Sequence, residues 1–252
     1  MGDPAGGSGR EGGGGSREGG GGSRPGGGLH PALLRTLMAL TLLSGLVDAV
    51  SYLGLGRVFT ANMTGNVVVL GFAAAGAAGF STPATLTSLG AFLIGALCAG
   101  LAARRMARRG RLLILAMATE AVLGAVAASV AMLATTVASG GSRYAVIGVL
   151  AFAMGVRNAT VRRLAVPDMT TTVLTMTLTG LAADSRLAGG TGQGSARRAS
   201  AVAAMLIGAF AGAALYLHAG AGLPLVIAAV SAAGTAVAFR LSGAPAVLDA
   251  AR

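Results

Sequence analysis

Two carboxylates interrupt long apolar stretches, and their chemistry needs an explanation first. Asp48 lies in the run Gly-Leu-Val-Asp-Ala-Val, and Glu120 lies in the run Met-Ala-Thr-Glu-Ala-Val. An acid at membrane depth costs about 2.5–3.5 kcal/mol on insertion scales, so it usually faces a cavity or a partner. The pattern predicts an ion or proton site. The alternatives are an interfacial position for Asp48, and for Glu120 a hydrogen bond or an ion pair with another helix.

A polar run separates two of the apolar segments. Thr60-Ala-Asn-Met-Thr-Gly-Asn66 supplies hydroxyls, two amides and a flexible glycine. Irregular backbone at membrane depth is tolerated only where it is buried in protein or lines a water-filled cavity. Asn62, Thr64 and Asn66 are therefore candidate ligands for a substrate or an ion. Their alternative role is to cap a helix start, although capping needs one such residue rather than three.

A second polar group lies further along the chain. Arg157 and Asn158 end the fifth apolar segment and are expected to face inward. Thr171, Thr172 and Thr175 then supply hydroxyls at the start of a short helix. Two helix N-termini that point into a bundle favour an anion or a polar solute. Alternatively, these hydroxyls bond to the backbone of their own helix.

The composition places these residues in a membrane. Of the 252 residues, 54% are hydrophobic and only 11% are charged, against about 25% charged in a typical soluble domain. So few charges cannot cover a water-facing surface, so lipid must solvate much of the chain. The apolar segments run over residues 35–55, 66–80, 86–103, 112–138, 144–155, 170–183, 199–218 and 223–241. The second and sixth are short for a spanning helix, which needs about 20 residues.

The arginines favour six crossings over eight. If the two short segments enter and leave on the same side, nearly all arginine clusters lie on one side of the membrane, and only Arg57 and Arg143 lie on the other. Because cytoplasmic loops carry the excess of Lys and Arg, this topology places both termini in the cytoplasm. The expected location is the bacterial plasma membrane. The positive-inside rule also explains the net charge of +11 without a nucleic-acid partner.

An internal repeat is consistent with six crossings. Gly45-Leu-Val-Asp-Ala49 resembles Gly155-Val-Arg-Asn-Ala159, and a polar run follows each. Three crossings per repeat would invert the second copy, a plan that recurs in secondary transporters. The sequence thus predicts an all-α polytopic transmembrane helix bundle, with about six spanning helices, two short or re-entrant helices and an inverted repeat. Its expected parts are a disordered tail over residues 1–30, repeats over 31–141 and 142–241, and a short tail over 242–252.

Known enzyme signatures are not found. The two histidines, His30 and His218, are far apart, and no Cys/His cluster offers metal ligands. The sequence has no Walker A loop, nucleotide fingerprint or nucleophile elbow. We therefore expect no enzyme activity, no cofactor and no metal.

Three runs resemble one family. They are the run that begins Gly45-Leu-Val-Asp-Ala-Val-Ser-Tyr-Leu, the run Gly56-Arg-Val-Phe-Thr-Ala-Asn-Met-Thr-Gly-Asn66, and the run that begins Met154-Gly-Val-Arg-Asn-Ala-Thr. They are similar to the YoaK family, also called DUF1275, over about residues 33–241. The resemblance implies a bacterial multi-pass inner-membrane protein whose molecular function is not established. The family often has Gln where this chain has Arg157, so charge and ligand preference at that position are expected to differ.

The features together favour transport. A secondary transporter or permease for a small polar or anionic solute, with proton coupling through Glu120 or Asp48, explains the repeat, the polar breaks and the buried acids. The alternative is a non-transport membrane scaffold or sensor subunit, which explains the helices but not the paired breaks. Membrane lipid and a small solute are the expected partners.

Overall fold

Six long helices form the body of the protein. A computed structural model describes residues 30–106, 108–133, 140–164 and 174–250. The long helices are α1 (Pro31–Gly54), α3 (Thr82–Arg105), α4 (Arg109–Leu133), α5 (Gly141–Leu164), α7 (Ser195–Ala219) and α8 (Gly222–Leu241). Each is long and apolar enough to cross a membrane. The expected all-α polytopic bundle with six spanning helices is confirmed.

The spanning helices differ in what covers them. Most residues of the spanning stretches of α1 and α5 are buried inside the protein, whereas only 17% are buried in α3 and in α7. The exposed side chains of these outer helices include Leu93, Leu97, Leu206 and Phe210. Apolar residues on an outer helix face are stable where lipid is the solvent. The core of the protein therefore lies along α1 and α5, and the outer helices contact the bilayer.

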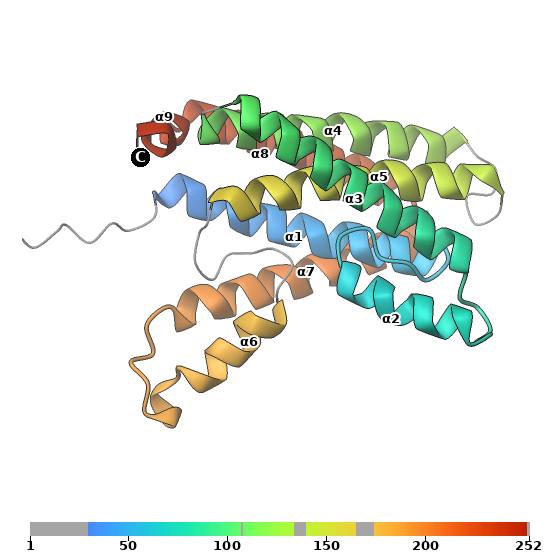
Figure 1. The fold of residues 1–252 in the computed structure, drawn as a ribbon, viewed down its shortest axis with the longest axis horizontal. Coiled ribbons are helices and arrows are strands. Elements are labelled where there is room, and N and C mark those ends of the chain that lie inside the picture. Colours follow the sequence, from blue (N-terminus) through green and yellow to red (C-terminus); the bar gives the residue numbers. More distant parts are fainter. Residues whose placement is uncertain (1–29, 107, 134–139, 165–173, 251–252) are drawn as a thin grey trace, which may run out of the picture.

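Two helices are shorter than the length of about 20 residues that a spanning helix needs. These are α2 (Met63–Ala74) and α6 (Leu174–Ala183), with 12 and 10 residues, and α2 packs on α3 whereas α6 packs on α7. In Figure 1, α2 ends at the end of the bundle where α1 ends and α3 begins. Likewise, α6 ends at the end of the bundle where α5 ends and α7 begins. Both short helices therefore have the course of re-entrant segments, with N-termini directed toward mid-depth.

The two halves make equivalent packing contacts. Helix α1 packs against α7, and α3 packs against α5. In both pairs the helices run in the same direction, whereas α5 runs opposite to α1 (Figure 1). The repeat predicted from the sequence pairs α5 with α1, and in that pairing the second half is inverted relative to the first.

Glycines at matching positions make these close approaches possible. A Cβ atom at Gly45 would clash with the Met205 carbonyl on α7, and one at Gly155 would clash with the Phe92 carbonyl on α3. A glycine of an outer helix has the same role. A Cβ atom at Gly95 on α3 would clash with the Phe152 carbonyl on α5. Small residues let helix backbones approach in a membrane, where packing drives association.

The chain after α8 is partly helical. The expected C-terminal tail contains the seven-residue helix α9 (Ala244–Ala250). The Asp249 carboxylate accepts a hydrogen bond from the Gly110 backbone N–H at 2.8 Å, which attaches α9 to the start of α4. The expected disordered tail lies outside the described residues except for His30, and the repeat boundary at residues 141–142 stays a prediction.

Candidate functional site

A buried ion pair joins three helices at the centre of the bundle. Arg157 on α5 is fully buried, and its Nη1 atom lies 2.8 Å from the Oε1 atom of Glu120 on α4. The same Nη1 donates to the Leu40 carbonyl of α1 at 3.3 Å, and Nη2 donates to the hydroxyl of Ser44. The guanidinium therefore connects α5 to both α4 and α1. The inward orientation expected for Arg157 is present.

Glu120 lies deep within the bundle. It follows the start of α4 at Arg109 by about 16 Å at 1.5 Å per residue, which is close to mid-bilayer. Its Oε2 atom is buried, and no described residue bonds to it. The cavity that borders Glu120 has a volume of about 10 Å³, which holds one water molecule at most. The carboxylate therefore pairs through one oxygen and has no room for a solute beside it in this conformation.

Asp48 holds the irregular segment that returns from α1 to α2. It is 4% exposed, and its Oδ1 atom accepts hydrogen bonds from the backbone N–H groups of Thr60 at 2.9 Å and Ala61 at 2.7 Å. The second oxygen, Oδ2, is buried and has no partner among the described residues. The Asp48 side chain is therefore enclosed by protein, and its depth in the membrane, on which the interfacial alternative depends, stays a prediction.

The segment reverses direction directly after α1. Gly56 and Arg57 have φ values of 93° and 57°, a left-handed region that few non-glycine residues adopt. Across this turn, the ring of Tyr52 on α1 stacks on the ring of Phe59 with centroids 4.8 Å apart. The turn brings Thr60 and Ala61 back along α1, where Asp48 can accept from both.

Asn66 on α2 holds the same segment through its side-chain amide. Its side chain accepts from the Phe59 backbone N–H at 2.8 Å and donates to the Phe59 carbonyl at 2.7 Å. It also donates to the hydroxyl of Ser88 on α3 at 3.0 Å, and Ser88 donates to the Phe59 carbonyl at 2.6 Å. The Asn66 amide thus holds the backbone of Phe59 and does not face an open cavity.

These groups form one polar network across the bundle. Ser44, which binds Arg157, lies one helical turn before Asp48, and Asp48 binds the segment that Asn66 holds. We call this set the polar network; its members are Ser44, Asp48, Asn66, Ser88, Glu120 and Arg157. It links helices of the first half to α5 of the second half.

The other described candidates have different surroundings. Asn62 is half-buried and caps α2 by accepting from the Gly65 backbone N–H at 3.3 Å, as the capping alternative predicted. Thr64 and Thr175 are exposed, and Asn158 is half-buried. Thr171 and Thr172 lie outside the described residues.

Two members of the network were not predicted. Ser44 and Ser88 lie within apolar spans, and both are fully buried. A serine one turn from an intramembrane acid is a signal that could have found Ser44, but nothing near Ser88 in the sequence points to Asn66. Among the residues described, no group of three His, Cys, Asp or Glu side chains is placed to hold a metal ion.

Comparison with known proteins places the chain in a family. Residues 36–238 match the family described as "Protein of unknown function (DUF1275)". The chain is 33% identical to the "UPF0700 transmembrane protein YoaK" of Bacillus subtilis (strain 168) over 154 residues, which are 59% of this chain and 65% of that protein. No solved structure matches the chain. The protein is therefore a multi-pass membrane protein that belongs to the DUF1275 family.

Proposed function

We propose that this protein is a secondary transporter or permease for a small polar or anionic solute, coupled to protons. The observation that carries the proposal is the polar network, which places an ion pair between two oppositely oriented halves. Charged residues inside membrane proteins are expensive, and they mark ion and substrate pathways. Inverted halves with short helices at matching places can rock against each other around such a site.

The ion pair suggests how a proton and an anion are coupled. A proton bound to Glu120 removes the negative charge that Arg157 pairs with. The buried guanidinium then needs another anion, because an unpaired buried charge costs several kcal/mol. An anionic solute supplies that charge, and its release on the other side allows Glu120 to lose its proton and restore the pair. The closed space beside Glu120 corresponds to a state without solute.

The arginines give the proposed orientation. Arg104 and Arg105 end α3, and Arg162 and Arg163 end α5, at the end of the bundle where α1 begins. Because positive loops stay in the cytoplasm, we place this end and both termini on the cytoplasmic side of a bacterial plasma membrane.

The test is uptake by proteoliposomes. Purified protein is reconstituted, a pH gradient is imposed, and radiolabelled carboxylates, phosphate, amino acids and neutral polar solutes are screened. We expect gradient-dependent uptake of at least one anion, which Glu120→Gln abolishes. Asp184→Asn is the matched control, because that carboxylate is 54% exposed and pairs with Arg198 at the surface. If no solute moves, the transport proposal fails and the scaffold or sensor alternative replaces it.

A further inference from the structure

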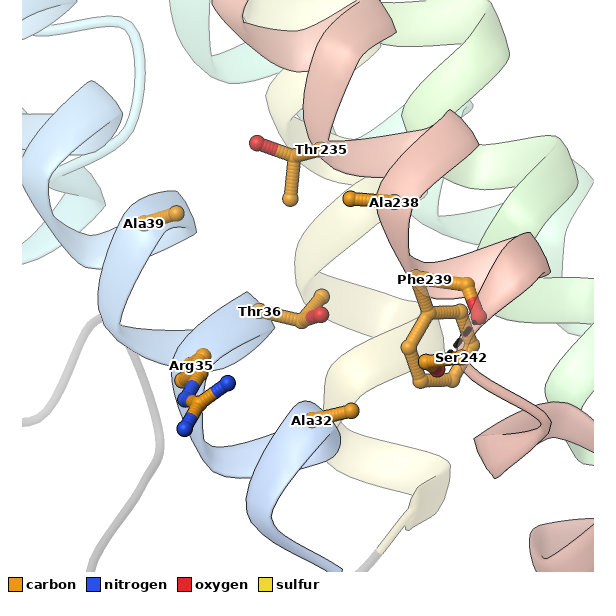
Figure 2. Close-up of a pocket in the computed structure, with 8 residues that line it drawn as sticks. All are labelled: Ala32, Arg35, Thr36, Ala39, Thr235, Ala238, Phe239 and Ser242. Atoms are coloured by element: carbon orange, nitrogen blue, oxygen red, sulfur yellow. Dashed lines mark hydrogen bonds between the residues drawn. The ribbon is translucent and has the colours of Figure 1, made fainter.

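A second pocket lies away from the polar network, between the start of α1 and the end of α8. It has a volume of about 270 Å³. Figure 2 shows Arg35, Thr36 and Ala39 on the α1 side of this pocket, and Thr235, Phe239 and Ser242 on the α8 side. This volume lies just below the roughly 300 Å³ at which pockets for drug-sized molecules start, so it suits a smaller ligand group. We call it the α1–α8 pocket.

Two polar side chains in the α1–α8 pocket have unused hydrogen-bonding capacity. Arg35 is exposed and makes no hydrogen bond or ion pair with any residue that the structure describes. Thr36 is 5% exposed, and its hydroxyl has no partner in the described part of the chain. Other helix hydroxyls donate to the carbonyl four residues earlier, as Thr41 and Thr235 do. The Thr36 hydroxyl is instead directed toward α8 across the pocket (Figure 2).

The chemistry of the lining is amphipathic. The guanidinium of Arg35 is the charged group of the lining, and none of the described residues that line the pocket carries a carboxylate. The remaining surface comes from three alanines, the Phe239 ring and the hydroxyls of Thr235 and Ser242. The Thr235 and Ser242 hydroxyls already donate to backbone carbonyls. A ligand that fits this lining has one anionic group for Arg35 and Thr36, with an apolar part beside it.

The position of the pocket suggests which ligand this is. Arg35 lies in the first two turns of α1, and Ser242 directly follows the last residue of α8. Both ends belong to membrane-spanning helices, so the pocket lies at the boundary between the hydrocarbon core and the headgroups. Arginines also end α3 and α5 on this side. Basic pockets between spanning helices at this depth hold the headgroups of anionic lipids.

We propose that the α1–α8 pocket binds the phosphodiester headgroup of an anionic phospholipid. Arg35 pairs with the phosphate, the Thr36 hydroxyl donates to one of its oxygens, and the glycerol backbone lies along Phe239 and the alanines. This site is independent of the transport proposal, because it shares no residue with the polar network.

The test uses the full chain in an uncharged detergent after removal of lipid. Short-chain phosphatidylglycerol, short-chain phosphatidylcholine and inorganic phosphate are titrated separately, and binding is followed by native mass spectrometry. We expect phosphatidylglycerol to bind more tightly than the other two ligands. Arg35→Gln should weaken its binding about fivefold, the ratio expected for one arginine near a lipid surface.

Two further variants separate the pocket from general charge. Thr36→Val keeps the shape of the side chain and removes the hydroxyl, so it should also weaken binding, and it carries the test if Arg35→Gln does not fold. Arg240→Gln is the matched control, because Arg240 is exposed near the same end of α8 but does not line the pocket. Equal binding of phosphatidylcholine, an equal loss in Arg240→Gln, or no loss in either pocket variant would overturn the site. Equal affinity for inorganic phosphate would identify a free-anion site and overturn the lipid assignment.

Discussion

The Nη1 atom of Arg157 lies 2.8 Å from the Oε1 atom of Glu120, and both side chains are buried. The two residues belong to different halves of the inverted arrangement, so the contact spans the interface between them. Removal of one partner of a buried pair leaves an uncompensated charge, whereas removal of both charges does not. Loss of either charge alone should therefore lower the free energy of unfolding.

A double-mutant cycle tests this pair. We expect Arg157→Gln to lower the free energy of unfolding by about 3–5 kcal/mol, because Glu120 loses its partner. The double variant Glu120→Gln and Arg157→Gln should recover part of that loss, since two amides can bond to each other. Unfolding in mixed detergent micelles measures the free energy of unfolding of the unchanged protein, of the single variants Glu120→Gln and Arg157→Gln, and of the double variant.

An exposed pair provides the control for this cycle. Asp184 lies 2.6 Å from Arg198 at the surface, so Asp184→Asn should cost at most about 1 kcal/mol. Strictly additive effects at Glu120 and Arg157 would show that the two side chains do not act as a pair.

Asp48 is expected to act as a hydrogen-bond acceptor for the segment before α2. Asp48→Ala leaves the Thr60 and Ala61 backbone N–H groups unsatisfied, at about 1–3 kcal/mol for each buried group. Asp48→Asn keeps an oxygen in the same place, so it should cost much less. Hydrogen exchange at Thr60 and Ala61 should become faster in the alanine variant and change little in the asparagine variant. Equal damage in both variants would show that the charge of Asp48 matters more than its acceptor oxygen.

Two glycines of α3 test the close approach of the helices. A Cβ at Gly95 would meet the Phe152 backbone, whereas a Cβ at Gly90 would meet nothing within 4 Å. We expect Gly95→Ala to destabilise the protein by about 1–3 kcal/mol through overpacking. Gly90→Ala should be neutral or stabilising by up to about 1 kcal/mol, because alanine favours a helix. Thermal unfolding in detergent compares the two, and equal effects would contradict the close contact between α3 and α5.

Much of the fold was predictable because the bilayer sets the length of a spanning helix, and the six long apolar helices have that length. An ion pair with another helix was one of the alternatives for Glu120, and the pair with Arg157 confirms it. The identity of that partner needs the packing of α5 on α4. The apolar run ends at Gly155 because Arg157 and Asn158 lower the local hydropathy. A spanning helix requires this segment to extend beyond both ends of the run, and α5 does so from Gly141 to Leu164.

The roles of the polar side chains were harder to predict. Asn66 was expected to be a candidate ligand, and its amide instead holds the backbone of Phe59. The sequence shows that a polar group needs a partner, but not whether the partner is a solute or a backbone group brought near by a turn. The left-handed conformation of Arg57, which creates that turn, has no signal in its residue type.

Labelling of single cysteines tests the six-crossing topology. The native Cys98 is first replaced by alanine, and cysteines are then placed at His30, Ala77 and Thr191, which lie before α1, between α2 and α3, and before α7. With six crossings and re-entrant α2 and α6, positions 30 and 191 share one side, and position 77 lies on the other. With eight crossings, all three positions share one side.

The readout is a membrane-impermeant maleimide added to intact cells and then to opened membranes. We expect the Ala77→Cys variant alone to react in intact cells, because the arginine-rich end of the bundle stays in the cytoplasm. The His30→Cys and Thr191→Cys variants should react only after the membrane is opened. Reaction at all three positions from the same side would contradict the re-entrant course of α2 and α6. Reaction at positions 30 and 191 but not at 77 in intact cells would keep six crossings and reverse the orientation.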